Sequence, residues 1–167
     1  MKIREATKED IEQIIFLLQQ VSELHYISRP DIFKRKSKND LKEYATENLE
    51  NNEKKTIVAT DEKLRINGIL ICKVKEVKCH NNLKSSRILW IEELCVDGEC
   101  RKNGIGKMLM LEAENIAKNL NCERIELNCW EFNESAIKFY REIGMETQRR
   151  VMEKKVGGDK KWNILKN

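Results

Sequence analysis

Apolar residues recur along this chain at two spacings, which divide it into alternating helices and strands. Four segments repeat an apolar residue every third or fourth position, as amphipathic helices do: 8–25, 37–51, 105–120 and 134–143. Shorter runs rich in β-branched residues predict strands at 2–6, 55–60, 66–77, 86–96 and 124–130. Weaker alternation over 145–156 predicts one or two closing strands.

The predicted order β-α-α-β-β-β-α-β-α-β indicates an α/β fold with helices on both faces of one sheet. Neither an internal repeat nor a long linker interrupts it. We therefore expect a single domain over residues 1–156, followed by a basic tail over 157–167. A carboxylate on a strand of such a sheet is partly desolvated, which raises its pKa and improves it as a base.

Composition narrows the class of protein. The chain has 167 residues, 40% of them hydrophobic and 36% charged, which fits one soluble domain with a real core. No apolar run approaches the ~20 residues of a membrane span, and the N-terminal segment has no apolar signal-peptide core. We expect a cytoplasmic protein without a membrane partner.

Charge and cysteine content argue against two further classes of partner. The net charge of the chain is +4. Residues 147–167 contain seven Lys/Arg and two Asp/Glu, so the charge of this segment alone is larger than that of the whole chain. A solvated chain end explains the run better than attraction to RNA or a phosphorylated cofactor, so we expect no nucleic-acid partner. The six cysteines form no CxxC pair and the two histidines lack zinc spacing, which favours reduced thiols and no metal site.

Candidate chemistry gathers between residues 88 and 111. Two carboxylates, Glu92 and Glu93, interrupt an apolar strand, and a basic loop with Gly104 and Gly106 then leads into a helix. Uncovered N–H groups at a helix N-terminus are a common phosphate site. The Walker A pattern fails because Arg101 stands where its first glycine belongs, and the dinucleotide pattern lacks its third small residue. A tight turn alone would also explain the two glycines.

Two motifs in this region and beyond it resemble those of the GCN5-related N-acetyltransferases. Val96-x4-Arg101-x-x-Gly104-x-Gly106 is similar to motif A of that family, and the segment from Asn133 to Met145 resembles its motif B, with Met in place of the last Phe. The resemblance covers roughly residues 1–156. It implies a mixed, mostly antiparallel sheet of about six to seven strands with about four helices, and acetyl-CoA as the acetyl donor.

The resemblance also assigns roles to individual residues. The loop amides of such proteins hold the pyrophosphate of coenzyme A, a role that falls here on Arg101, Lys102, Asn103, Gly104, Ile105, Gly106 and Lys107. The pantetheine arm pairs with the central strand, which implies Leu94, Cys95 and Val96. Asn133 and Tyr140 match positions that contact the cofactor or its sulfur.

Acetylation of an amine requires a base for the amine proton and an acid for the leaving thiolate. Strict alternation places Glu92 on one face with Trp90, Leu94 and Val96, and Glu93 on the other face. We take Glu92 as the candidate base, with a structural salt bridge to a lysine as the alternative. Glu93 is structural, or faces the acceptor if the strand bulges. Tyr140 is the candidate acid, with core packing as its alternative.

The acceptor site is the least determined part of the prediction. The resemblance implies a cleft built by the first two helices, their loop and the last strands, which would include His25, Tyr26, Phe33 and residues 148–152. Packing of a helix end explains the aromatic residues equally well. We expect direct transfer to a small amine or a peptide N-terminus. A regulatory acyl-CoA-binding module, a protein or ribosome-associated acetyltransferase and a homodimer remain open.

Overall fold

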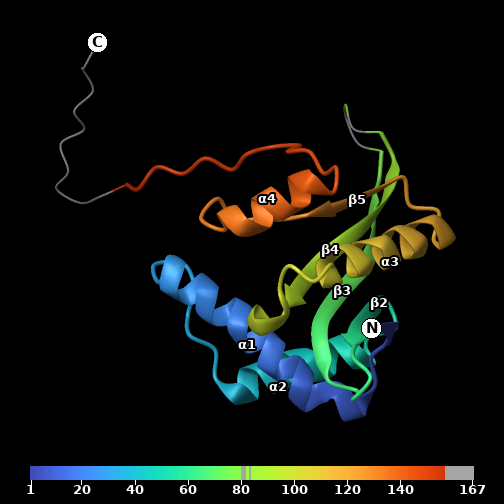
Figure 1. Ribbon diagram of the computed structural model, residues 1–167. Helices are drawn as coiled ribbons and strands as arrows, with labels where there is room; N and C mark the ends of the chain where they lie inside the picture. The colour runs from blue at the N-terminus through green and yellow to red at the C-terminus, as the bar shows by residue number, and fades with distance from the viewer. Residues whose placement is uncertain (80–81, 83, 157–167) are drawn as a thin grey trace. The chain divides into compact units, whose positions relative to one another are not determined.

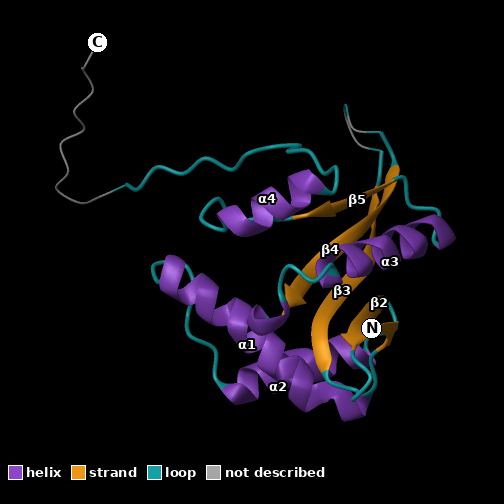
Figure 2. Ribbon diagram, viewed as in Figure 1, coloured by secondary structure: helices purple, strands orange, loops and turns teal. Residues whose placement is uncertain are grey.

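A computed structural model describes residues 1–79, 82 and 84–156 of the chain (Figure 1). The chain divides into two compact units, Met1–Asn133 and Glu134–Asn167. Among the described residues, the first contains the sheet, α1, α2 and α3, and the second contains α4 (Figure 2). One domain over 1–156 therefore stays a prediction, and the predicted tail, 157–167, lies outside the described residues.

The elements follow the predicted order as far as the last helix. The first unit contains β1 (Lys2–Glu5), η1 (Lys8–Asp10), α1 (Ile11–Ser28), α2 (Lys38–Glu50), β2 (Lys54–Thr60), β3 (Ile66–Val77), β4 (Ser86–Val96), η2 (Gly98–Cys100), α3 (Ile105–Asn119) and β5 (Arg124–Leu127). The second unit contains α4 (Glu134–Glu142). Ser37 caps α2 as the side-chain acceptor of the Asp40 amide. Within the described part of the chain, no helix combines the length and apolarity needed to cross a membrane.

In the described part of the chain, the sheet has five strands in the order β1-β2-β3-β4-β5. The first four are antiparallel neighbours, whereas β5 runs parallel to β4. The mixed, mostly antiparallel class is confirmed, but six to seven strands was too many, because no strand forms in residues 145–156. The apolar side chains Val151, Met152 and Val156 there are almost fully exposed, so they supply no buried face to support a strand.

Helices cover the two faces of the sheet in the first unit. On one face, α1 and α2 bury a cluster that includes Ile14, Leu17 and Leu41 against Ile69 and Ile71 of β3. On the other face, α3 lies so close to β3 that a Cβ on Gly68 would be 2.9 Å from Ile105 and 3.0 Å from Leu109. The missing side chain at Gly68 thus lets the first turn of α3 approach the end of the central strands.

Candidate active site

The loop between β4 and α3 is anchored by Asp97. Its buried carboxylate accepts hydrogen bonds from Gln20 (3.2 Å) and the Glu99 amide (3.3 Å) and pairs with Arg65 (2.7 Å). Burial opposes ionisation, but these donors outweigh it and lower the pKa of Asp97. The charged carboxylate therefore ties α1, the start of β3 and the end of β4 together at this point.

The first turn of α3 presents uncapped amides. Gly104 is its N-cap at a φ of 77°, in the left-handed region, and no side chain caps the helix there. The first N–H groups of a helix have no intrahelical partner, and Arg101, Lys102 and Lys107 are exposed around them. This combination suits a diphosphate, as the predicted coenzyme A segment 101–107 requires.

The central strand has one open edge. β4 and β5 pair from Ile88–Arg124 to Ile91–Leu127 and then separate (Figure 1). Residues 93–96 still pair with β3 on their other side, but among the described strands they have no partner on the β5 side. Leu94, Cys95 and Val96 thus lie on an edge that an extended ligand could join by main-chain hydrogen bonds.

A β-bulge lies where the two strands separate, and it corrects the predicted facing of the carboxylates. Glu93 pairs with Ile71 and Ile91 pairs with Cys72, so Glu92 is an extra residue on β4. The prediction that Glu92 and Glu93 point to opposite faces is wrong, because an extra residue breaks the alternation. Glu92 bonds Lys54, which also bonds Asn48 of α2, and Glu93 bonds Tyr44 of the same helix, so both carboxylates face α2.

Glu92 lies in an ion cluster with two lysines. Lys54 Nζ lies 2.7 Å from one carboxylate oxygen and Lys73 Nζ lies 2.6 Å from the other. Burial would raise the pKa of Glu92, but the hydrogen bonds from the two lysines outweigh it and lower that pKa. Glu92 thus forms salt bridges to lysines, which was the predicted alternative to its role as a base. A carboxylate with a lowered pKa and two bound cations is a weak proton acceptor.

Glu93 has the properties that were predicted for Glu92, namely partial desolvation and a raised pKa. Glu93 is half-buried, and Tyr44 Oη lies 3.4 Å from its Oε1. Burial raises the pKa of Glu93 and outweighs the opposite effects of Lys36 and Tyr44. Burial also raises the pKa of Tyr44, which keeps its phenol protonated as a donor. Glu93 is therefore the better placed of the two carboxylates to accept a proton.

A small cavity opens beside Glu93. Its volume is about 50 Å³, and it is bordered by α1, the loop from α1 to α2, α2 and β4. Leu18, Val21 and Leu41 supply apolar walls, and the side chains that carry chemistry are Ser22, His25, Phe33, Lys34, Lys36, Tyr44 and Glu93. Three of the four predicted acceptor residues of the first unit, His25, Phe33 and Glu93, thus meet at one cavity.

The fourth predicted acceptor residue, Tyr26, does not line this cavity. The Arg35 guanidinium lies 4.9 Å from the centre of its ring, and Arg35 also pairs with Glu23 at 2.6 Å. Tyr26 and His25 are adjacent on α1, so a helical rotation of about 100° separates their side chains. Tyr26 therefore packs with the loop rather than facing Glu93.

Four aromatic rings connect this cavity with the segment that follows β5. His25 stacks on Phe33 with centroids 4.8 Å apart, and Trp130 lies 5.1 Å from Phe33. Phe132 completes the group at 5.7 Å from His25 and 5.9 Å from Trp130. The predicted strand 124–130 ends early, at Leu127, so that Trp130 lies in this cluster and not in the sheet.

Cys95 lies on the central strand but has no nucleophilic character. Its thiol is buried 3.4 Å from the Leu17 carbonyl oxygen, and burial raises the pKa of Cys95 to about 12. A thiol of this pKa stays protonated and is a poor nucleophile near neutral pH. The side chain packs in the core cluster between the sheet and α1. Among the described residues, no group of His, Cys, Asp and Glu could hold a metal ion.

The candidate acid belongs to the other unit. Tyr140 lies on α4, partly buried, with its ring 5.3 Å from that of Phe139. Asn133 is the last residue of the first unit, and its amide bonds the Trp130 carbonyl oxygen at 2.9 Å. The predicted roles of Asn133 and Tyr140 at the cofactor stay predictions.

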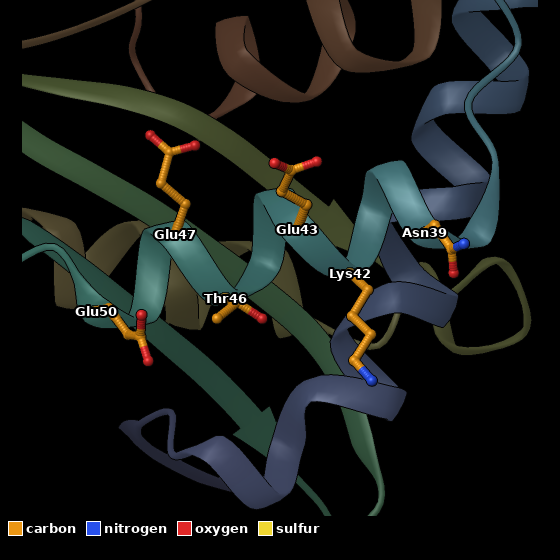
Figure 3. Close-up of a pocket in the computed structure, with 6 residues that line it drawn as sticks. All are labelled: Asn39, Lys42, Glu43, Thr46, Glu47 and Glu50. Atoms are coloured by element: carbon orange, nitrogen blue, oxygen red, sulfur yellow. The ribbon is translucent and has the colours of Figure 1, made fainter.

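A second, open hollow follows the outer surface of α2 (Figure 3). Its six lining residues all come from this one helix: Asn39, Lys42, Glu43, Thr46, Glu47 and Glu50. Glu50 is paired with Lys8 at 2.7 Å. A single solvated helix face without converging groups gives no basis for catalysis.

Sequence reasoning missed several residues of the cavity. Tyr44, Lys34 and Lys36 received no role from the sequence, and neither did Trp130 and Phe132 of the neighbouring aromatic cluster. Two signals for these residues were present in the sequence: the two aromatic residues just before Asn133, and the basic run 34–36 before the second helix. Neither signal indicates by itself that the two loops meet.

Comparison with known proteins identifies the family and the fold. Residues 18–145 match the model of the acetyltransferase (GNAT) family. The tetramutant of the BH1408 protein from Bacillus halodurans is 28% identical, with a TM-score of 0.89 over 93% of this chain and 100% of that one.

Two more distant structures share the fold. A transcriptional regulator from Bacillus halodurans C-125 is 22% identical, with a TM-score of 0.72 over 93% of this chain and 99% of that one. The aminoglycoside N-acetyltransferase AAC(6')-Iy, in complex with CoA, is 18% identical, with a TM-score of 0.73 over 93% of both chains.

Proposed function

This chain belongs to the acetyltransferase (GNAT) family, and we propose that it transfers the acetyl group of acetyl-CoA to a primary amine. The observation that carries the proposal is the position of Glu93. Its half-buried side chain borders a cavity and lies on β4, where that strand has parted from β5. A proton acceptor is thus available beside the strand edge that suits the donor.

The donor would be held by main-chain groups and positive charge. We assign the pyrophosphate to the amides of residues 102–107, with Arg101, Lys102 and Lys107 adding charge. The pantetheine arm would pair with Leu94, Cys95 and Val96 along the open edge of β4. A related fold, that of AAC(6')-Iy, has been obtained in complex with CoA, which supports this assignment.

The residues of the site then divide the proton transfers between them. The amine nitrogen bonds the thioester carbonyl carbon while Glu93 accepts the amine proton, directly or through a water in the cavity. A main-chain N–H near Val96 stabilises the oxyanion that develops. The C–S bond then breaks, and Tyr140 gives its proton to the departing sulfur. Both substrates are bound at once, so the acetyl group passes directly to the amine.

In this proposal Glu92 is a structural residue and not the base that the sequence predicts. Its negative charge is matched by Lys54 and Lys73, so we assign it to holding the bulge that aims Glu93 at the cavity. The second candidate function is a regulatory acyl-CoA-binding module. It is favoured by one observation, the shared fold of the transcriptional regulator from Bacillus halodurans C-125.

Transfer to an amine panel separates these two functions. Purified protein is incubated with acetyl-CoA and amines, and acetylated products are detected by mass spectrometry. Thiol reagents are avoided because Cys79 and Cys129 are exposed. An enzyme acetylates at least one amine, and Tyr140→Phe lowers its turnover by about 100-fold while CoA affinity changes little. Tyr26→Phe is the matched control, since Tyr26 lies outside the cavity. CoA binding without any product would favour the regulatory module.

A further inference from the structure

The charges around the cavity are unusual for an acceptor site that takes polyamines or aminoglycosides. Such polycations require an excess of carboxylates, because each ammonium group loses hydration when it binds. Here the charge of Glu92 is balanced by Lys54 and Lys73, which leaves Glu93 as the acidic residue that lines the cavity. Lys34 and Lys36 line the same cavity. Two cations therefore face one carboxylate whose neutral form is favoured by burial.

The two lysines differ from the other cations of their loop. Arg35 pairs with Glu23 at 2.6 Å, and Lys38 pairs with Glu12 at 2.8 Å. Lys34 and Lys36 form no salt bridge with any residue that the structure describes. Lys36 Nζ lies 4.8 Å from the centre of the Tyr44 ring, and the hydroxyl of that ring lies 3.4 Å from Glu93 Oε1. Lys36 thus contacts the ring of Tyr44, and Glu93 contacts the hydroxyl of the same side chain.

We propose that the acceptor is an amine that also carries a carboxylate, an amino-acid-type substrate, with its amine at Glu93 and its carboxylate at Lys36 and Lys34. This inference rests on the proposed acetyltransferase function and names its substrate class. Ion pairing with the substrate supplies the carboxylate partner that the two lysines lack among the described residues. The cavity of about 50 Å³ holds only about three water-sized groups, enough for the charged head of such a molecule. The rings of His25 and Phe33 border its carbon frame.

The test compares acceptors that differ only in the carboxylate. Phenylalanine is assayed beside phenethylamine and phenylalanine carboxamide, and lysine beside cadaverine and lysine carboxamide. Spermidine and kanamycin are assayed as polycationic acceptors. The carboxamide is the stricter comparison, because its amine loses a proton more readily than that of the amino acid. We expect the acid of at least one set to exceed its amine and carboxamide by about ten-fold or more in kcat/KM.

A charge-neutral variant then assigns the preference to the cavity. Lys36→Gln should lower kcat/KM for the acid by about 10- to 100-fold and for the decarboxylated amine by less than about three-fold. Lys38→Gln is the matched control, since Lys38 is paired with Glu12, and it should leave both values unchanged. Thermal unfolding of both variants checks that they are folded.

The outcomes are distinct. Equal or faster transfer to the amines, the carboxamides or the polycations would overturn the inference and leave the acetyltransferase proposal standing. An equal effect of Lys36→Gln on acid and amine would also overturn it. If no acceptor of any kind were acetylated, the proposed function itself would fail, and the inference with it.

Discussion

The ion cluster of Glu92 gives the sharpest prediction about this fold. In Glu92→Gln the charge that faces two lysines is lost while the shape of the side chain is kept. Lys54, whose side chain is 10% exposed, then lacks its carboxylate partner, whereas Lys73, at 37%, can still reach water. We therefore expect a loss of stability that comes mostly from Lys54.

The magnitude follows from the geometry. At 2.7 Å and 2.6 Å, and with an effective dielectric constant of about 20, each pair has a Coulomb energy of about 6 kcal/mol. Desolvation offsets most of this energy, and loss of one partner of a buried pair costs about 3 to 5 kcal/mol. Because glutamine retains one acceptor oxygen and Lys73 is half solvated, we expect about 2 to 3 kcal/mol, or a Tm lower by about 4 to 12 °C.

Urea unfolding at neutral pH measures this difference. The matched control is Glu5→Gln, because the pair of Glu5 with Lys55 is exposed and should contribute less than about 0.5 kcal/mol. Since the folded pKa of Glu92 is lowered, its contribution is present above its unfolded pKa of about 4.5 and is lost as the pH falls through the folded value. The wild type and Glu92→Gln should thus converge in acid. A loss below about 0.5 kcal/mol at neutral pH would refute the buried cluster.

Two further predictions concern the approach of α3 and the proposed base. Gly68→Ala places a Cβ 2.9 Å from Ile105 and 3.2 Å from the Cys95 carbonyl, so we expect about 1 to 3 kcal/mol of destabilisation and weaker CoA binding by calorimetry. Gly98→Ala, with its nearest neighbour at 3.5 Å, should change neither measurement, and an equal effect of the two would contradict close packing as the cause. Glu93→Gln should lower kcat by about 100-fold or more. Because the pKa of Glu93 is raised in the folded state, ionisation of this carboxyl destabilises the wild type as the pH rises. Glutamine does not ionise, so the variant should gain stability relative to the wild type at higher pH. A kcat close to that of the wild type would remove Glu93 from the mechanism.

Local pattern was enough to predict most elements of the first unit. The β-branched run 66–77 and the capped segment after Ser37 became β3 and α2 almost as expected, since alternation and capping are decided by neighbouring residues. The glycine loop was also apparent, because a left-handed residue before an amphipathic helix has few alternatives to glycine. The closing strands were predicted wrongly, since alternation does not show whether a buried face exists for a strand to join.

What the sequence by itself determined was the class of protein and the segment that carries its chemistry. The glycine loop and the second motif resemble those of the GNAT acetyltransferases whichever of the two strand carboxylates is used, and the family match over residues 18–145 confirms this resemblance. Only the tertiary structure distinguished Glu92 from Glu93. Their difference comes from one bulge and from lysines on other strands, and a bulge depends on pairing with β3, which no local pattern encodes. The charge that surrounds the cavity beside Glu93 was likewise decided by contacts between distant segments.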